Sequence, residues 1–167
     1  IAQCLVGSEM CIRDSLGELP KESPFFYLME TARNLCLVLE KKADLGREIR
    51  LAYSQEDKET LQEIANIKIP VLLQRLQDFY QSFRTQWNLE NKSFGFEVQT
   101  VRIGGLLQRL KDVQEILNAY LREEISGIAE LNEPQKAFHY FEQNEIRSLN
   151  YNLWTDICLL YTSPSPR

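Results

Sequence analysis

Histidine and cysteine are scarce in this chain of 167 residues, which has one histidine, His139, and four cysteines. Only one of these cysteines, Cys36, lies away from the ends, and we expect it to be a small buried apolar residue. One histidine and one internal cysteine do not supply the clustered ligands of a zinc site. His139 has no partner for acid–base catalysis that the sequence reveals, so a structural or solvent-exposed role is expected. The sequence offers no catalytic, cofactor-binding or metal-binding residue, and no cofactor is expected.

A long apolar run and an excess of positive charge are also missing. No stretch approaches the roughly 20 consecutive apolar residues of a membrane-spanning helix. The 19 basic residues are outnumbered by 24 acidic ones, which gives a net charge of −5 and argues against binding to a phosphate backbone. We therefore expect neither a membrane nor a nucleic acid as partner. With 44% apolar residues, a chain of this length can bury a core without disulfides.

The two ends of the chain are related to each other at the level of DNA. Residues 158–167, Cys-Leu-Leu-Tyr-Thr-Ser-Pro-Ser-Pro-Arg, can be back-translated as TGT CTC TTA TAC ACA TCT CCG AGC CCA CGA. The reverse complement, read in a shifted frame, encodes Val-Gly-Ser-Glu-Met-Cys-Ile-Arg-Asp, which is the run Val6–Asp14. A sequencing adaptor on both sides of a read produces such a pair, and both strings resemble translated adaptors in metagenomic reading frames. We expect residues 1–15 and 157–167 to be foreign and disordered.

Residues 16–156 would then be a fragment of a longer protein, and apolar residues recur along it at helical spacing. The pattern predicts an all-α fold with core helices at about residues 24–54, 57–66, 70–90 and 96–124. Short connections favour an up-and-down bundle of three to four helices. An irregular, aromatic-rich C-terminal tail follows, with Phe138, Tyr140, Phe141, Tyr151 and Trp154.

Each predicted helix has an apolar stripe that marks the face expected to be buried. In residues 70–90 the opposite face is polar. The stripes consist of Leu28, Ala32, Leu35, Leu39, Leu45, Ile49 and Ala52 in the first helix; Leu61, Ile64 and Ala65 in the second; Leu72, Leu76, Phe79, Tyr80, Phe83 and Trp87 in the third; and Val101, Ile103, Leu106, Leu107, Leu110, Val113, Leu117, Tyr120 and Leu121 in the fourth.

Glycine and proline mark points where these helices could begin, bend or end. Ser23 and Pro24 are typical of an N-cap and a first helical position. Gly46 interrupts the first pattern, so residues 24–54 form one long helix or two abutting ones. The helix 57–66 is expected to close at Asn66, before a proline. Two adjacent glycines, Gly104-Gly105, cost about 1 kcal/mol each in a helix, so we expect another helix to approach them closely.

The run from Trp87 to Leu106 carries the most specific motif of the chain. It resembles W-x-x-E-N-K-x-x-G-F-E-V-Q-x-x-R-x-G-G-L, a signature of the helical domain that follows the catalytic barrel in a bacterial branch of family 20 glycoside hydrolases, the β-N-acetylhexosaminidases. The segments Arg33–Gly46 and Tyr120–Leu131 also resemble that domain, so the resemblance covers most of Phe25–Leu131.

The resemblance implies that the intact enzyme removes terminal β-linked N-acetylglucosamine or N-acetylgalactosamine from glycans. In such enzymes the 2-acetamido oxygen of the substrate attacks the anomeric carbon. A glutamic acid protonates the leaving oxygen, and the preceding aspartate orients the acetamido group. This chain has no adjacent Asp-Glu pair, and Glu56-Asp57 has the reverse order. We therefore expect the barrel to lie upstream of Leu16 and this fragment to be inactive alone.

A structural role follows from the aromatic residues that the bundle does not need. Phe94, Phe96 and Trp154 are expected to pack against the missing barrel of the same chain or against a second subunit in a homodimer. The alternative is a free-standing helical protein–protein interaction module that binds a partner helix in an apolar groove. The residues contain no signal for a cellular location. A cytoplasmic location is slightly favoured.

Overall fold

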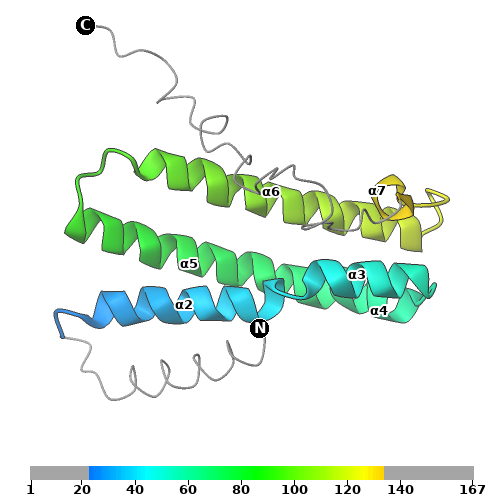
Figure 1. Cartoon of the computed structure of the whole chain (residues 1–167), viewed down its shortest axis with the longest axis horizontal. Coiled ribbons are helices and arrows are strands. Elements are labelled where there is room, and N and C mark those ends of the chain that lie inside the picture. Colours follow the sequence, from blue (N-terminus) through cyan, green and yellow to red (C-terminus); the bar gives the residue numbers. More distant parts are fainter. Residues whose placement is uncertain (1–22, 134–167) are drawn as a thin grey trace, which may run out of the picture.

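The computed structural model describes residues 23–133, which form an all-α bundle (Figure 1). This part of the chain confirms the predicted fold class, and no helix in it is long and apolar enough to cross a membrane. His139 and the predicted aromatic tail lie outside the described residues, as do both ends expected to be foreign. The elements are α2 (Phe26–Lys42), α3 (Leu45–Ser54), α4 (Lys58–Glu63), the π-helical turn η1 (Ile64–Lys68), α5 (Ile69–Glu90), α6 (Phe96–Leu121) and α7 (Ala129–Asn132).

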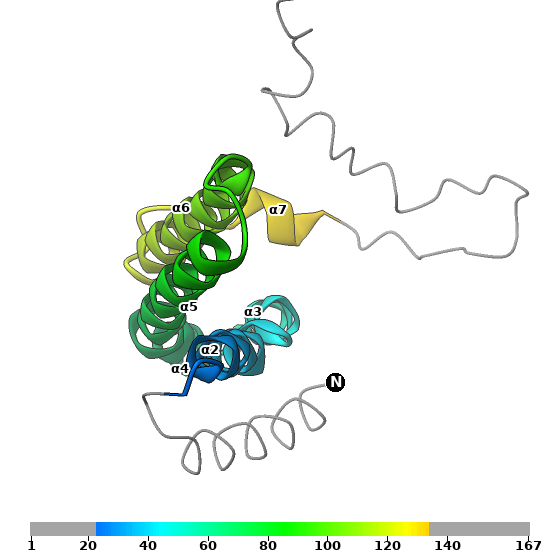
Figure 2. The ribbon, with the colours of Figure 1, turned by 90° about the vertical axis from the view of Figure 1, so that its left-hand side faces the viewer.

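The described helices pass along the bundle three times, in alternating directions. α2 and α3 run in one direction, α4, η1 and α5 return as one continuous rod, and α6 runs back along it (Figure 1). α5 contacts both α2 and α6, and Figure 2, which looks along the helices, shows α5 between them. At the other end of the rod, α4 contacts α3 and α6.

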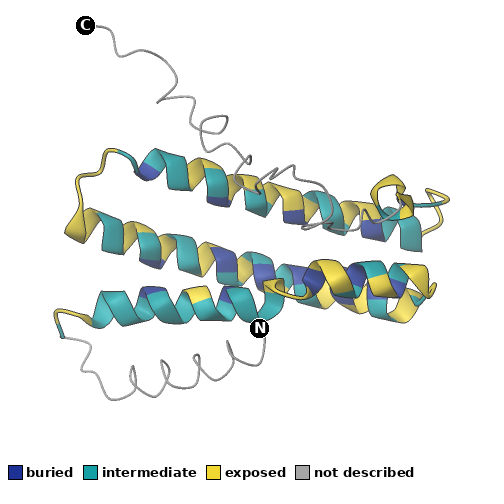
Figure 3. Ribbon diagram, in the orientation of Figure 1, coloured by how far each residue is buried: buried dark blue, intermediate teal, exposed yellow. Residues whose placement is uncertain are grey.

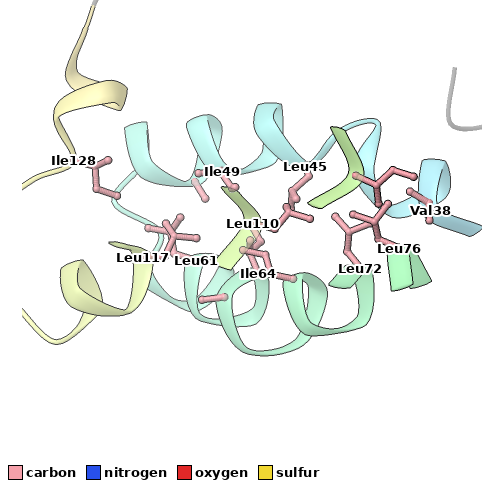
Figure 4. Packing of buried hydrophobic residues seen from close by; sticks show 14 residues of the cluster. Val38, Leu45, Ile49, Leu61, Ile64, Leu72, Leu76, Leu110, Leu117 and Ile128 are labelled. Atoms are coloured by element: carbon pink, nitrogen blue, oxygen red, sulfur yellow. The ribbon is translucent and has the colours of Figure 1, made fainter. Parts of the chain in front are cut away.

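The core lies where the rod meets α3 and α6. Its largest fully buried side chains are Leu61, Ile64, Ile69 and Leu72 of the rod and Leu117 of α6. Figure 4 shows how Leu45 and Ile49 of α3 and Ile128 meet this cluster. Burying one such side chain stabilises the fold by about 1.5–3 kcal/mol, and Figure 3 shows buried positions recurring along each long helix.

The predicted stripes are correct for most of α5 and α6. Leu72 and Leu76 are buried, and the predicted polar face of α5 is exposed, with Gln74, Gln77, Asp78, Gln81 and Arg84. In α6, Ile103, Leu110 and Leu117 are buried, but Val101 is 58% exposed. Val101 therefore does not belong to the inward stripe.

The buried face of α2 differs from the prediction. Thr31 and Val38 are buried, whereas Leu35 is 39% exposed. The Thr31 hydroxyl donates to the carbonyl of Tyr27 at 2.9 Å, so a polar side chain can face inward here without an unsatisfied group. A search for apolar spacing overlooks such a position.

Polar contacts also attach α2 to α5. The Arg75 Nη1 donates to the Leu37 carbonyl at 2.7 Å and to Glu40 Oε2 at 2.8 Å. The Lys41 ammonium first, and then Arg75, hold the pKa of the Glu40 carboxyl below its usual value. The Asn34 amide donates to Ser82 Oγ at 3.1 Å. This interface is therefore held by hydrogen bonds as well as by apolar packing.

The first predicted helix is two helices, and their junction is not Gly46. α2 begins at Phe26 rather than at Pro24, after a turn in which the Phe26 N–H donates to the Ser23 carbonyl at 3.1 Å. α2 ends at Lys42 and α3 begins at Leu45. Gly46 lies inside the first turn of α3, with nothing within 4 Å of an added Cβ.

The predicted helix end at Asn66 is wrong, because the rod continues through Pro70. Proline has no N–H and clashes with the carbonyl four residues earlier in a regular helix. In η1 the Ile69 N–H bonds to the Ile64 carbonyl, five residues back, which widens the turn just before Pro70. The Ala65 carbonyl, five residues before Pro70, accepts a hydrogen bond from Gln114 Nε2 of α6 at 2.8 Å. A side chain of another helix thus replaces the missing donor.

Replacing Gln114 by alanine is expected to lower the free energy of unfolding by about 1–3 kcal/mol, because the buried Ala65 carbonyl loses its donor. Urea unfolding followed by circular dichroism measures the change. Gln108 is a matched control, since it also lies on α6 but is exposed and donates to the Asp112 carboxylate at the surface. Gln108→Ala is expected to change stability by no more than about 0.5 kcal/mol; equal losses would contradict the role of Gln114.

Candidate functional site

The connection between α5 and α6, residues 91–95, lies within the most specific sequence motif. It is held by hydrogen bonds to the adjoining ends of the two helices. The Trp87 indole N–H donates to the Lys92 carbonyl at 2.9 Å. Gly95 has a φ of 100°, in the left-handed region that glycine adopts without steric cost. The Glu97 carboxylate accepts from the Gly95 N–H at 2.7 Å and places a negative charge at the start of α6, where the helix dipole favours it.

Phe96 fills the space beneath this connection. It is 7% exposed, and its ring centroid lies 5.6 Å from Tyr80, 5.6 Å from Phe83 and 5.7 Å from Trp87. The expectation that Phe96 faces a partner is therefore wrong, since the bundle itself buries this ring. Phe94, two residues earlier, is 76% exposed, whereas Trp154 lies outside the described residues.

Glu90 joins the start of α2 to the end of α5. Its Oε1 accepts from the Tyr27 hydroxyl at 3.1 Å, and its Oε2 accepts from Gln86 Nε2 at 3.1 Å. Partial desolvation and the hydrogen bond to the Glu90 carboxylate raise the pKa of the Tyr27 phenol above its usual value. Tyr27 therefore stays a donor at neutral pH. No sequence signal could find this pair, since 63 positions separate the two residues.

The glycine pair of the motif lies on the open face of α6. An added Cβ at Gly104 or Gly105 meets nothing within 4 Å, and both residues are exposed. The expected close approach of another helix is therefore wrong for the part of the chain that the structure describes. The turn contacts account for Trp87, Glu90 and Gly95, but no packing within this range accounts for the glycines.

Gly104→Ala and Gly105→Ala are each expected to raise the free energy of unfolding by about 0.5–1 kcal/mol, because alanine restricts the unfolded chain and favours the helix. Gly95→Ala is expected to lower it by about 1–2 kcal/mol, because an L-residue is strained in the left-handed region. Thermal and urea unfolding of the three variants measure the expected gains in stability at Gly104 and Gly105 and the expected loss at Gly95. A loss of stability on Gly105→Ala would mean that this face is covered.

The acidic residues of the described range have structural partners or lie in solvent. The Asp57 carboxylate caps α4, accepting from the Thr60 N–H at 3.0 Å and from its hydroxyl at 2.6 Å. The hydroxyl bond first, and then the backbone bond, hold the pKa of Asp57 below its usual value. Within residues 23–133 no three His, Cys, Asp or Glu side chains gather to hold a metal ion. Cys36 is half-buried, rather than buried as expected.

Two hollows of the described surface are lined by charged side chains. One hollow lies between α3 and α7 and is lined by Arg47, Arg50, Leu51, Tyr53, Ser54, Leu131 and Asn132. Another is lined by Glu56, Glu123 and Glu124, and the carboxylates of the last two bind Lys58 at 2.8 Å and Arg122 at 2.7 Å, respectively. Glu123 and Glu124 thus take part in ion pairs within the domain.

Comparison with known proteins identifies the family. Residues 13–150 match the glycoside hydrolase 20C C-terminal domain, so the match includes the α5–α6 connection and every described helix. A comparison with curated proteins finds no match. The family description names a C-terminal domain of glycoside hydrolases, which makes this domain an accessory to the catalytic part of such an enzyme. The chain belongs to the family of glycoside hydrolase 20C C-terminal domains.

Proposed function

We propose that this domain is the non-catalytic C-terminal part of a β-N-acetylhexosaminidase and that it supports the catalytic barrel that precedes it. The observation that carries the proposal is the family match over residues 13–150. The signature from Trp87 to Leu106 is in agreement, because it resembles the helical domain behind such barrels. The intact enzyme would then release terminal N-acetylglucosamine or N-acetylgalactosamine from glycans.

The contacts of the acidic side chains support a structural rather than a chemical contribution. Substrate-assisted hydrolysis needs one carboxylic acid to protonate the leaving oxygen and a second to orient the acetamido group. In this domain Asp57 caps a helix, Glu90 binds Tyr27, and Glu97 binds the Gly95 N–H. The two catalytic acids would therefore come from the barrel.

The free-standing interaction module is less well supported. A groove that binds an amphipathic helix is lined mainly by apolar side chains. The hollow between α3 and α7 instead presents Arg47, Arg50, Ser54 and Asn132 beside its two leucines. No specific observation favours this alternative over barrel support.

Two measurements test the proposal. Sequencing the source DNA upstream of Leu16 is expected to reveal a (β/α)₈ pattern with an adjacent Asp-Glu pair; a start codon near Leu16 would contradict it. The second measurement compares this chain with the intact protein, using a chromogenic N-acetyl-β-glucosaminide. The intact protein is expected to hydrolyse the substrate, whereas this chain is expected to leave it unchanged. Turnover by the purified chain would contradict a non-catalytic role.

A further inference from the structure

The two ends of the bundle differ in chemistry. Phe94, Leu89 and Phe25 are 76%, 64% and 62% exposed and are the three most exposed large apolar side chains of the described range. All three belong to the end where α2 begins and the α5–α6 connection turns, which Figure 2 views head-on. We call Phe25, Leu89 and Phe94 the apolar end.

The opposite end is equally exposed but charged. There the turn between α3 and α4 and the segment after α6 present Glu56, Lys58, Arg122, Glu123 and Glu124. Lys58 binds Glu123 and Arg122 binds Glu124. Turns at a bundle end are exposed in any case, but they need not be apolar: at the charged end they carry the charged residues that are usual at a surface. Exposure alone therefore does not account for the apolar side chains at the apolar end.

Three polar donors at the apolar end are satisfied within the domain. Trp87 donates to Lys92, Tyr27 donates to Glu90, and the Gly95 N–H donates to Glu97. Beside the exposed Asn91, Lys92 and Ser93, the feature that sets this end apart is its apolar surface. A partner that covers it must therefore present an apolar patch of its own.

The size and position of the apolar end indicate which partner covers it. Three side chains are far fewer than the roughly 20–30 residues a side of a stable interface between separate molecules, because free association loses translational and rotational entropy. Two surfaces linked by one polypeptide need a much smaller contact area to stay together, because the link gives each a high effective concentration near the other. α2 begins at this end, so the polypeptide before Ser23 reaches the bundle here.

We propose that the apolar end docks on the part of the same polypeptide that precedes this domain, through Phe25, Leu89 and Phe94. The proposal rests on the proposed function, in which that part is the catalytic barrel. Docking here fixes the orientation of the domain on the barrel and removes the most exposed apolar side chains from water. A second copy of the domain is the competing occupant.

The test uses the intact enzyme with Leu89→Asp and Phe94→Asp. Leu51→Asp is the matched control, since Leu51 is 51% exposed but lies on α3, near the charged end. Limited proteolysis of the segment before Ser23 and the temperature of irreversible loss of glycosidase activity are measured. We expect the two apolar-end variants to be cleaved about ten times faster and to lose activity at a lower temperature, while Leu51→Asp matches the parent.

A second measurement avoids the question of whether a variant folds. Hydrogen exchange of the connection 91–95 is compared between the unmodified intact enzyme and this chain alone. Slower exchange in the intact enzyme is expected, and equal exchange would overturn the proposal.

The remaining outcomes separate the two proposals. Equal behaviour of all three variants in an enzyme that has its barrel would overturn the docking and leave the proposed function intact. Conversion of a dimer to a monomer by Leu89→Asp, with cleavage unchanged, would assign the apolar end to a second copy and overturn it as well. An upstream region without a barrel would instead refute the proposed function itself.

Discussion

Replacing Leu72 by alanine is expected to lower the free energy of unfolding by about 2–5 kcal/mol. Leu72 has no exposed surface and belongs to the central cluster. Alanine leaves a cavity there, because neighbouring helices relax only partly around a lost side chain. Since domains are stable by only about 5–15 kcal/mol, this one substitution removes a large share of the total. Urea unfolding of the chain, followed by circular dichroism, measures the loss.

The matched control for Leu72 is Leu51→Ala on α3. Leu51 is 51% exposed, so its truncation is expected to change stability by less than about 1 kcal/mol. If the two substitutions had similar effects, the cluster around Leu72 would not be the centre of the folding unit.

Phe96→Ala is expected to cost about 3–5 kcal/mol. The ring of Phe96 is in contact with Tyr80, Phe83 and Trp87, and aromatic pairs contribute beyond the area they bury. Its removal leaves the α5–α6 connection without the side chain that holds both helices together at that end. Thermal and urea unfolding of the variant measure the effect.

Phe94→Ala is the control for Phe96→Ala, since the two phenylalanines are only two residues apart. In this chain Phe94 is 76% exposed, and its truncation is expected to leave stability within about 0.5 kcal/mol of the parent. A large loss at Phe94 in this chain would show that a described part of the domain covers it.

Much of the fold could be predicted because apolar periodicity reports burial directly. The stripe and the polar face of α5 follow from spacing alone, as do Leu110 and Leu117 of α6. The face of α2 could not be predicted in this way, because Thr31 is buried through a hydrogen bond to its own helix. Periodicity counts apolar side chains and does not register a polar one that is satisfied locally.

The helix end predicted at Asn66 failed for a different physical reason. Proline usually ends a helix because its ring clashes with an earlier carbonyl and leaves an acceptor without a donor. Here the wide turn η1 precedes Pro70, and Gln114, far along the chain, supplies a donor to Ala65. A rule based on neighbours in sequence has no access to a donor on another helix.

The candidate site could be predicted only in part. The motif from Trp87 to Leu106 indicated the family that the comparison confirmed. It did not separate Phe94 from Phe96, because the burial of Phe96 comes from Tyr80, Phe83 and Trp87 on another helix. The exposure of Phe25 and Leu89 could not be predicted either, since the residue type alone does not show whether an apolar side chain is buried or exposed.

The turn η1 changes the angular spacing of side chains along the rod. A π-helical turn accommodates about one residue more than an α-helical turn, so side chains before and after Ile64–Lys68 do not keep the constant angular spacing of a regular helix. A stripe drawn at one fixed period across α4 and α5 therefore loses register at η1, comparable to a discontinuity in a coiled-coil repeat.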